Sequence, residues 1–556
     1  MDKLYEFERE PVSEGNLQPG RYFAGLFAGE HVAGTEFVIG AMFVAWGASV
    51  ADIFVGLALG NLLAVLCWTF ICAPIATDTR LTLYWYLRRI AGPMTTTIYN
   101  VLNAVLFCIL AGCMITVSAS AVRIPFGIPP QTEWIPTDFR FVLVVLTVGA
   151  VVVLLAILGF KKLAQFASVC SPWMFLMFVA GGVALLPGLA IHALEDKEIN
   201  SLAEFIQLAE TYIWTGVAPD PANQVSFWHV TAFAWICNLA MHVGLSDMAL
   251  FRYARKPSYG FYSACGMYLG HYTAWIAAGI MGAAAAAMLN MSMTDIDSGL
   301  MANHALGISG IIAVVIAGWT TSNPTLYRAG LALQAVTPGW PRWVVTLIAG
   351  AVTTVIACSP FVFTGLLNFV GLYGLLLMPV GAIVFVEHWI FPRIGYQQYW
   401  ASRKGLVLSW PALASWVIAV GLALFVNYQG YLHLFFLFLP VWFLTAILYI
   451  VFAGMAGAKD TNLPPFVAPA APKRVQIAAA PPRQGDGPLG ASGLIAGIVA
   501  AICLLVCLIW PLWIFWAGSE GYEARFETFK SLLIWPTILY FIAGTWFAVR
   551  WDAAKK

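Results

Sequence analysis

Apolar runs of about 20 residues recur along the whole chain, the length at which a helix crosses the roughly 30 Å hydrocarbon core of a bilayer. No other feature limits the possible folds as strongly. Hydrophobic residues make up 61% of the 556 positions and charged residues only 10%. The sequence therefore predicts an all-α polytopic membrane protein that has the lipid bilayer as its partner.

The apolar runs, read between polar segments, predict about fourteen membrane-spanning helices. Their expected ranges are 23–49, 52–75, 97–121, 139–159, 165–192, 227–249, 259–289, 305–327, 341–358, 362–390, 408–426, 431–454, 491–517 and 530–550. We also expect the external segment "SLAEFIQLAETYIW" to form a short helix on the outer surface.

The distribution of basic residues predicts the orientation. With the N-terminus inside, 23 of the 28 Lys and Arg residues fall on the cytoplasmic side, which is where they usually remain. We therefore expect a multi-pass protein of the cytoplasmic (inner) cell membrane with both termini in the cytoplasm. Its expected parts are a cytoplasmic segment (1–22), a twelve-span body (23–455), an Ala/Pro-rich linker (456–490), two additional helices (491–550) and a cytoplasmic tail (551–556).

Charge and motif content argue against several classes of function. The formal net charge is +1, which favours neither a nucleic-acid partner nor a basic membrane-surface patch. The ten cysteines lie in or beside apolar runs without CxxC spacing, so we expect small buried side chains. The chain has no nucleophile-and-base arrangement, metal-ligand spacing or phosphate loop, so we expect neither an enzyme nor an organic cofactor.

The first predicted span is too polar for a helix that faces lipid. Its segment "FAGLFAGEHVAGTEFVIGAMF" places Glu30, His31 and Glu36 among glycines, and ionisable residues inside a span are costly. One interpretation is a cytoplasmic approach, with the span beginning at Phe37, but residues 37–49 are too short to cross alone. The alternative that we favour is a broken helix, with backbone carbonyls freed between Gly29 and Gly34.

The sixth predicted span, "FWHVTAFAWICNLAMHVGLSDMALFRYARK", is also interrupted, because Gly244 and Ser246 weaken the helix. His242 alone is more typical of a hydrogen-bonded interior histidine, and Asp247 of a helix end or gate. Two broken spans five apart indicate inverted five-helix repeats around a midplane site. The repeats would cover about 23–192 and 227–390, followed by spans 11 and 12 at 408–454.

The eighth predicted span contains "AGWTTSNPTLYRAGLAL", and so much polarity at membrane depth needs polar partners. In an inverted-repeat arrangement, this span would place Thr320 and Thr321 beside the break in the first span. Two hydroxyls and several freed carbonyls form a suitable cage for Na⁺, a hard cation. The polar run is therefore expected to coordinate a cation.

Several motifs, taken in order, resemble the nucleobase:cation symporter family of cytosine permeases and hydantoin, allantoin and purine transporters. They are "LALGNLLAVL", "GFKKLAQFASVCSPW", "DMALFRYARK", "WTTSNPTLYRAGLAL" and "LLNFVGLYGLLLMPVGAIVFVEHWI" followed by "SWPALASW". The resemblance covers about residues 20–455 and implies a leucine-transporter-type fold with a 5+5 inverted repeat. The last two spans have no counterpart in that fold.

The resemblance also implies a set of site residues. A tryptophan of span 6 packs on the substrate ring in the family, and Trp235 matches it. Span 3 departs from the pattern, because Leu110 and Met114 replace a stacking tryptophan and a glutamine, so a cationic or non-aromatic solute stays an alternative. The expected substrate-binding residues are Glu30, His31, Trp235, Asn238, His242, Asn323 and Thr325, and the expected Na⁺ ligands are Gly29, Val32, Ala317, Thr320 and Thr321.

Together these features predict a secondary active symporter that imports a small nitrogenous solute, coupled to Na⁺ or H⁺, by alternating access. Glu30 is a rival coupling element, because a partly desolvated carboxylate can carry a proton or pair with a cationic solute. A different class of function is a non-transporting membrane sensor that keeps the same fold.

Overall fold

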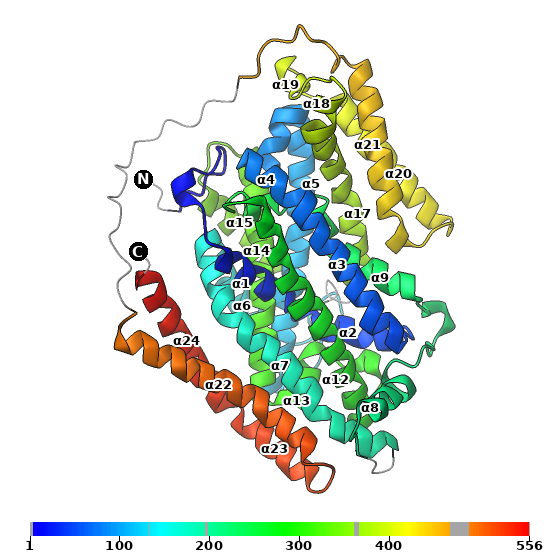
Figure 1. Cartoon of the computed structure of the whole chain (residues 1–556), viewed down its shortest axis with the longest axis vertical. Coiled ribbons are helices and arrows are strands. Elements are labelled where there is room, and N and C mark those ends of the chain that lie inside the picture. Colours follow the sequence, from blue (N-terminus) through cyan, green and yellow to red (C-terminus); the bar gives the residue numbers. More distant parts are fainter. Residues whose placement is uncertain (1–3, 132, 195–197, 361–365, 468–488, 555–556) are drawn as a thin grey trace.

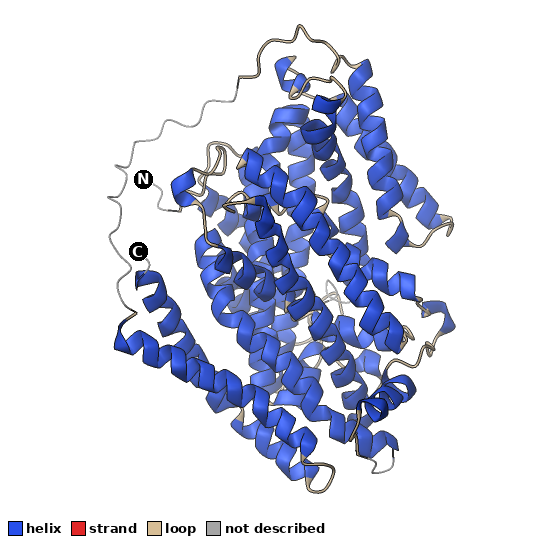
Figure 2. Cartoon of the chain, in the orientation of Figure 1, coloured by secondary structure: helices blue, strands red, loops and turns tan. Residues whose placement is uncertain are grey.

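The computed structural model describes residues 4–131, 133–194, 198–360, 366–467 and 489–554 (Figure 1). Across these ranges the chain forms helices and loops, without a strand beyond two isolated bridges (Figure 2). The prediction of an all-α protein is confirmed. Most of the expected linker, 468–488, lies outside the described residues.

The helices follow the order of the predicted spans. The first eight are α1 (Gly20–His31), α2 (Glu36–Ala45), α3 (Leu57–Cys67), α4 (Ala73–Thr79), α5 (Leu83–Val122), α6 (Phe139–Ile157), α7 (Phe160–Leu194) and α8 (Leu202–Leu208). The next are α9 (Phe227–Ile236), α10 (Leu239–His242), α11 (Met248–Phe251), α12 (Thr273–Leu289), α13 (Ser298–Leu306), α14 (Ile308–Val336) and α15 (Arg342–Ala357). The last are α17 (Leu366–Phe385), α18 (Phe391–Arg393), α19 (Trp400–Arg403), α20 (Trp410–Tyr428), α21 (Phe438–Met455), α22 (Gly490–Trp516), α23 (Tyr522–Leu532) and α24 (Ile534–Ala554). The α8 helix lies in the segment 201–214, for which the sequence predicts a short helix.

Within the described ranges, 10 helices are long and apolar enough to cross a membrane. The other predicted spans coincide with two interrupted segments, α1–α2 and α9–α11, with the polar α14 and with the 16-residue α15. In these four segments, a helix break, polar side chains or a short helix leaves no sufficiently long and apolar helix.

Both expected breaks are present. The α1 helix ends at His31, Val32 leaves the helical region with ψ 64°, and α2 begins at Glu36. A Cβ on Gly34 would lie 2.7 Å from Val117 and 3.4 Å from the carbonyl oxygen of Val314, so this break packs directly on α5 and α14. Only glycine permits such a close approach of backbone to helix.

The sixth span is interrupted twice. Residues 237–238 separate α9 from α10, and residues 243–247 separate α10 from α11. Leu245 has a φ of 67°, a strained value for a branched side chain that surrounding packing must hold in place. The predicted weakness at Gly244 and Ser246 therefore coincides with the second interruption.

Two helix boundaries correct the sequence prediction. The α14 helix continues to Val336 rather than ending near 327, since apolar residues and small residues follow Tyr327. Arg328, expected at the cytoplasmic end, is therefore fully buried inside the protein. The α5 helix begins at Leu83 instead of 97 and bends at Gly92, whose φ is 78°, before Pro93.

The arrangement of helices places α14 along α5 near the centre of the molecule, with α6, α7 and α15 beside α14 (Figure 1). The additional helices α22–α24 pack against α7, and α20 and α21 lie on the opposite side of the molecule (Figure 1). At the end of α24, Asp552 accepts hydrogen bonds from Arg21 and Tyr22 at 3.0 Å each. The additional helices thus contact the beginning of α1 as well as α7.

Gly381 of α17 supports the second interruption of the sixth span. A Cβ at this position would overlap the carbonyl oxygen of Val243. We expect Gly381→Ala to reduce the free energy of unfolding by about 1 to 2 kcal/mol, because overpacking forces backbone to move. Thermal unfolding of the purified protein in detergent measures the effect. Gly421→Ala is the control, since nothing lies within 4 Å of its added Cβ, and equal midpoints for both variants would contradict the prediction.

Candidate functional site

A small cavity of about 50 Å³ lies where the two broken spans meet α5, α14 and α17. Glu30 and Glu36 lie on either side of the first break, and Asn238 follows α9. The Nδ2 atom of Asn238 is buried and has no hydrogen-bond partner among the described residues. Apolar side chains complete the wall: Leu110 and Met114 from α5, and Val370 and Tyr373 from α17.

Oxygen atoms from α1 and α14 come together beside this cavity. The Thr321 hydroxyl lies 2.8 Å from the carbonyl oxygen of Glu30 and 3.0 Å from that of Ala317. The Thr320 hydroxyl lies 3.1 Å from the same Ala317 carbonyl. Hydroxyl and carbonyl oxygens without a carboxylate suit a hard monovalent cation, so the residues present fit Na⁺.

The carbonyl that reaches α14 belongs to Glu30, between the two expected ligands. A Cβ on Gly29 would lie 2.8 Å from Ala167, so α1 packs closely on α7 at this residue. Val32 donates its backbone N–H to Ala28 at 3.0 Å, which ends the α1 helix. The α14 helix therefore meets the end of α1 at the carbonyl of Glu30, one residue from Gly29 and two from Val32.

Beside the cavity, a buried ion triad joins the broken spans to α14. Arg328 donates to Glu30 Oε1 at 2.5 Å and Oε2 at 3.1 Å, and its Nε donates to Asp247 Oδ1 at 2.9 Å. Trp68 donates to the other oxygen of Asp247 at 2.6 Å. Glu30 is therefore buried and paired, and the contact of Asp247 with Arg328 joins α14 to the sixth span.

A second polar group surrounds Glu36 at the start of α2. The indole N–H of Trp275 donates to Glu36, and the His271 ring nitrogen lies 3.6 Å from the other carboxylate oxygen. The His271 ring stacks on Trp275 at 4.3 Å and meets the His31 ring edge-on at 5.0 Å. Glu36, His31 and His271 all line the cavity.

The remaining predicted residues divide into those at the cavity and those away from it. His31 and Thr325 line the cavity, and the Thr325 hydroxyl donates to the carbonyl of Thr321 at 2.8 Å. Trp235 instead packs on Phe438 at 4.6 Å, away from the cavity.

Two more predicted residues do not line this cavity. The His242 ring meets Trp68 at 5.0 Å, and its Nε2 lies 2.9 Å from the carbonyl oxygen of Trp235. Asn323 is buried with both amide atoms unpartnered among the described residues. Sequence reasoning did not assign Glu36, His271 or Tyr373 to the site, although the ionisable residues Glu36 and His271 inside predicted spans were a usable signal.

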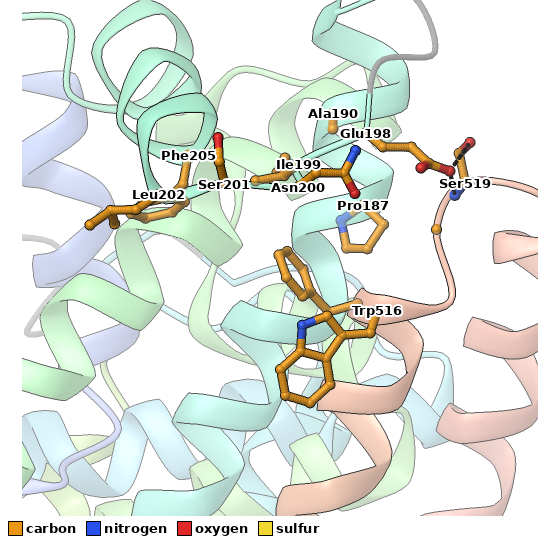
Figure 3. Close-up of a pocket in the computed structure, with 12 residues that line it drawn as sticks. Pro187, Ala190, Glu198, Ile199, Asn200, Ser201, Leu202, Phe205, Trp516 and Ser519 are labelled. Carbon is orange, nitrogen blue, oxygen red and sulfur yellow. Dashed lines mark hydrogen bonds between the residues drawn. The ribbon is translucent and has the colours of Figure 1, made fainter.

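A larger crevice of about 310 Å³ lies at the molecular surface between the end of α7, the approach to α8 and the end of α22 (Figure 3). There Glu198 accepts hydrogen bonds from the backbone N–H and hydroxyl of Ser519, at 3.1 and 3.3 Å (Figure 3). Trp516 on its wall is 73% exposed. Size favours this crevice, but the smaller cavity is the better candidate because the broken helices and buried ionisable residues converge there.

The chain has a partial similarity to known proteins in sequence. No model of a known protein family matches it. Cytosine permease of Escherichia coli K12 is 26% identical over 144 residues, which is 26% of this chain and 32% of the permease. The match thus spans about a third of the length of that relative.

The similarity is broader in structure. The closed, bromovinylhydantoin-bound form of Mhp1, a nucleobase-cation-symport-1 family transporter, aligns with a TM-score of 0.62 at 16% identity, over 82% of this chain and 100% of Mhp1. Inward-facing Mhp1 aligns with a TM-score of 0.59 at 17% identity, over 82% of this chain and 94% of Mhp1. A Na⁺-coupled sialic acid symporter aligns with a TM-score of 0.57 at 12% identity, over 81% of this chain and 91% of the symporter.

These structures share one fold despite low identity. The similar proteins are transporters and not enzymes, in agreement with the sequence prediction. A weak match in sequence and a strong match in structure confirm that the chain has the leucine-transporter-type fold and is similar to the nucleobase-cation-symport-1 family.

Proposed function

We propose that the protein is a secondary active symporter that imports a small nitrogenous solute of the nucleobase or hydantoin type together with Na⁺. The observation that carries the proposal is the contact of Thr321 with the Glu30 carbonyl at the broken end of α1. This contact lies beside the cavity and supports the proposal of a Na⁺ site formed by hydroxyl and carbonyl oxygens. The names of the similar proteins, which include a cytosine permease and a hydantoin-bound transporter, support the solute class.

Binding of the cation and of the solute would be coupled because the same two helices, α1 and α14, contribute to both sites. Thr321 and Ala317 belong to α14, whereas Glu30 belongs to α1, offers its carbonyl oxygen to Thr321 and also lines the cavity. A cation that holds the α1 end against α14 would favour the conformation in which the solute wall is complete. Cation and solute would then stabilise each other, and reciprocity requires equal coupling in both directions.

The proposed topology has fourteen spans with both termini in the cytoplasm, and the twelve-span body carries the transport site. The two additional spans would comprise α22 and α23–α24, which pack on α7 outside the cavity. The short exterior helix α8 would lie on the opposite side of the membrane from both termini. These assignments follow from the distribution of Lys and Arg along the chain.

Uptake into proteoliposomes tests the function. Labelled nucleobases, hydantoins and small amines are supplied outside with an inward Na⁺ gradient, a pH gradient or neither. We expect at least one solute to accumulate above equilibrium only with the Na⁺ gradient. Accumulation driven by the pH gradient alone would mean that H⁺, and not Na⁺, is the coupling ion. Binding without uptake would indicate a sensor. The absence of both binding and uptake would contradict the proposal.

A further inference from the structure

The charges around the cavity do not balance. Arg328 carries one positive charge and contacts two carboxylates, Glu30 and Asp247. Glu36 has no Lys or Arg partner among the described residues; its partners are the Trp275 indole and the His271 ring. If all three carboxyl groups are ionised and the histidines are neutral, Glu30, Asp247, Glu36 and Arg328 together carry a net charge of −2. Buried charge of this kind is costly and normally has a positive partner.

One sodium ion at the Thr321 site would neutralise one of these charges, on the side of Glu30. The charge on Glu36 then remains, at the first residue of α2 and 2% exposed. Because Glu36 lines the cavity, a positive group bound there could contact it directly.

The surroundings of Glu36 suit a nitrogenous cation. Asn238 lines the same cavity, and its Nδ2 atom, which is unpartnered among the described residues, could donate to an acceptor atom on an uncharged part of a larger solute. The aromatic ring of Tyr373 also lines the cavity, and aromatic faces attract cationic nitrogen. Leu110 and Met114 occupy the α5 wall, so an aromatic ring on that side of the solute would find no stacking partner.

We propose that Glu36 is the counter-charge for a protonated nitrogen of the solute, so that the transported species is a small organic cation of the amidinium or guanidinium class. This inference rests on the proposed symport function, but it assigns a cationic nitrogenous solute in place of the neutral nucleobases and hydantoins. Glu30, in contrast, is already held by Arg328 and is left with a structural role in the triad.

Pairs of equal shape and different charge test the inference. Guanidinium is compared with urea, and acetamidinium with acetamide, by thermal shift of the detergent-solubilised protein and by competition with uptake. We expect each cation to bind at least about 30-fold more tightly than its neutral partner, as for a desolvated charge pair. Equal binding within a pair, or no binding by any of the four probes, would overturn the inference.

Variants assign the preference to a residue. Glu36→Gln keeps the shape and removes the charge, and it should reduce cation affinity at least about 30-fold while changing the affinity for urea less than about threefold. Glu387→Gln is the matched control: Glu387 is also buried and accepts hydrogen bonds from Tyr399 and Tyr449, at 2.6 and 2.8 Å, but does not line the cavity. A cation preference that survives in Glu36→Gln would overturn the assignment.

Failure of this inference can be separated from failure of the proposed function. Coupled uptake of a neutral nucleobase or hydantoin, undiminished in Glu36→Gln, would overturn the cationic substrate class and leave symport intact. If Glu36→Gln does not fold, the comparison of charged with neutral probes on the unaltered protein still decides the question.

Discussion

Arg328→Gln should reduce the free energy of unfolding by about 3 to 5 kcal/mol, because it leaves two buried carboxylates without a cation. Arg328 is fully buried, and it contacts Glu30 of α1 and Asp247 of the sixth span. Thermal unfolding in detergent and the yield of folded protein measure the loss. The effect should exceed that of Gly381→Ala, since that substitution removes no charged partner.

Two further variants separate charge from packing. Adding Glu30→Gln and Asp247→Asn to Arg328→Gln removes all three charges, so most of the lost stability should return. Arg140→Gln is the matched control, because Arg140 also pairs with an aspartate, Asp138 at 2.6 Å, but its side chain is 58% exposed. It should change stability by less than about 1 kcal/mol. Equal midpoints for Arg328→Gln and Arg140→Gln would contradict the account of the triad.

Thr321→Ala should weaken Na⁺ binding by about 10-fold to 100-fold, because a hydrogen-bonding group that contacts a charged partner contributes about 1.5 to 3 kcal/mol. The solute affinity, measured over a series of Na⁺ concentrations at constant ionic strength, should lose most of its Na⁺ dependence. Thr321→Ser keeps the hydroxyl and should retain most of it. The Na⁺ assignment is wrong if Thr321→Ala and the unaltered protein show the same Na⁺ dependence.

A control for this effect must preserve the local chemistry. Thr147 of α6 donates its hydroxyl to the carbonyl of Leu143 at 2.8 Å, four residues earlier, as Thr321 does to Ala317. Thr147 is exposed and does not line the cavity. Thr147→Ala should leave both Na⁺ dependence and thermal stability nearly unchanged.

The broken spans could be predicted from the sequence because their signals are local. Gly34 permits the close approach of the first break to α14, and Gly244 lies where the sixth span leaves its helix. Hydroxyls on adjacent residues of α14 also pointed to an oxygen-lined site at a break. In the structure Thr321 contacts the Glu30 carbonyl, which lies between Gly29 and Val32, the two carbonyls expected from the sequence.

The triad could not be predicted in the same way, because its partners are far apart along the chain. Arg328 lies 298 residues from Glu30 and 81 from Asp247, and only the packed fold shows that two carboxylates surround it. Taken alone, an arginine after an Asn-Pro pair resembles the cytoplasmic end of a span. Trp235 stays a predicted substrate contact; in this structure its ring meets Phe438, 203 residues further along the chain, which no local pattern could indicate.

A structure of the protein with its transported solute and Na⁺ bound would test the central claim most directly. We expect the solute between the first break and Asn238, with a nitrogen within hydrogen-bond distance of Glu36. We expect the cation at the oxygens of Thr321, Ala317 and Glu30. Solute density confined to the surface crevice beside Trp516, with the cavity between the broken helices unoccupied, would contradict the account.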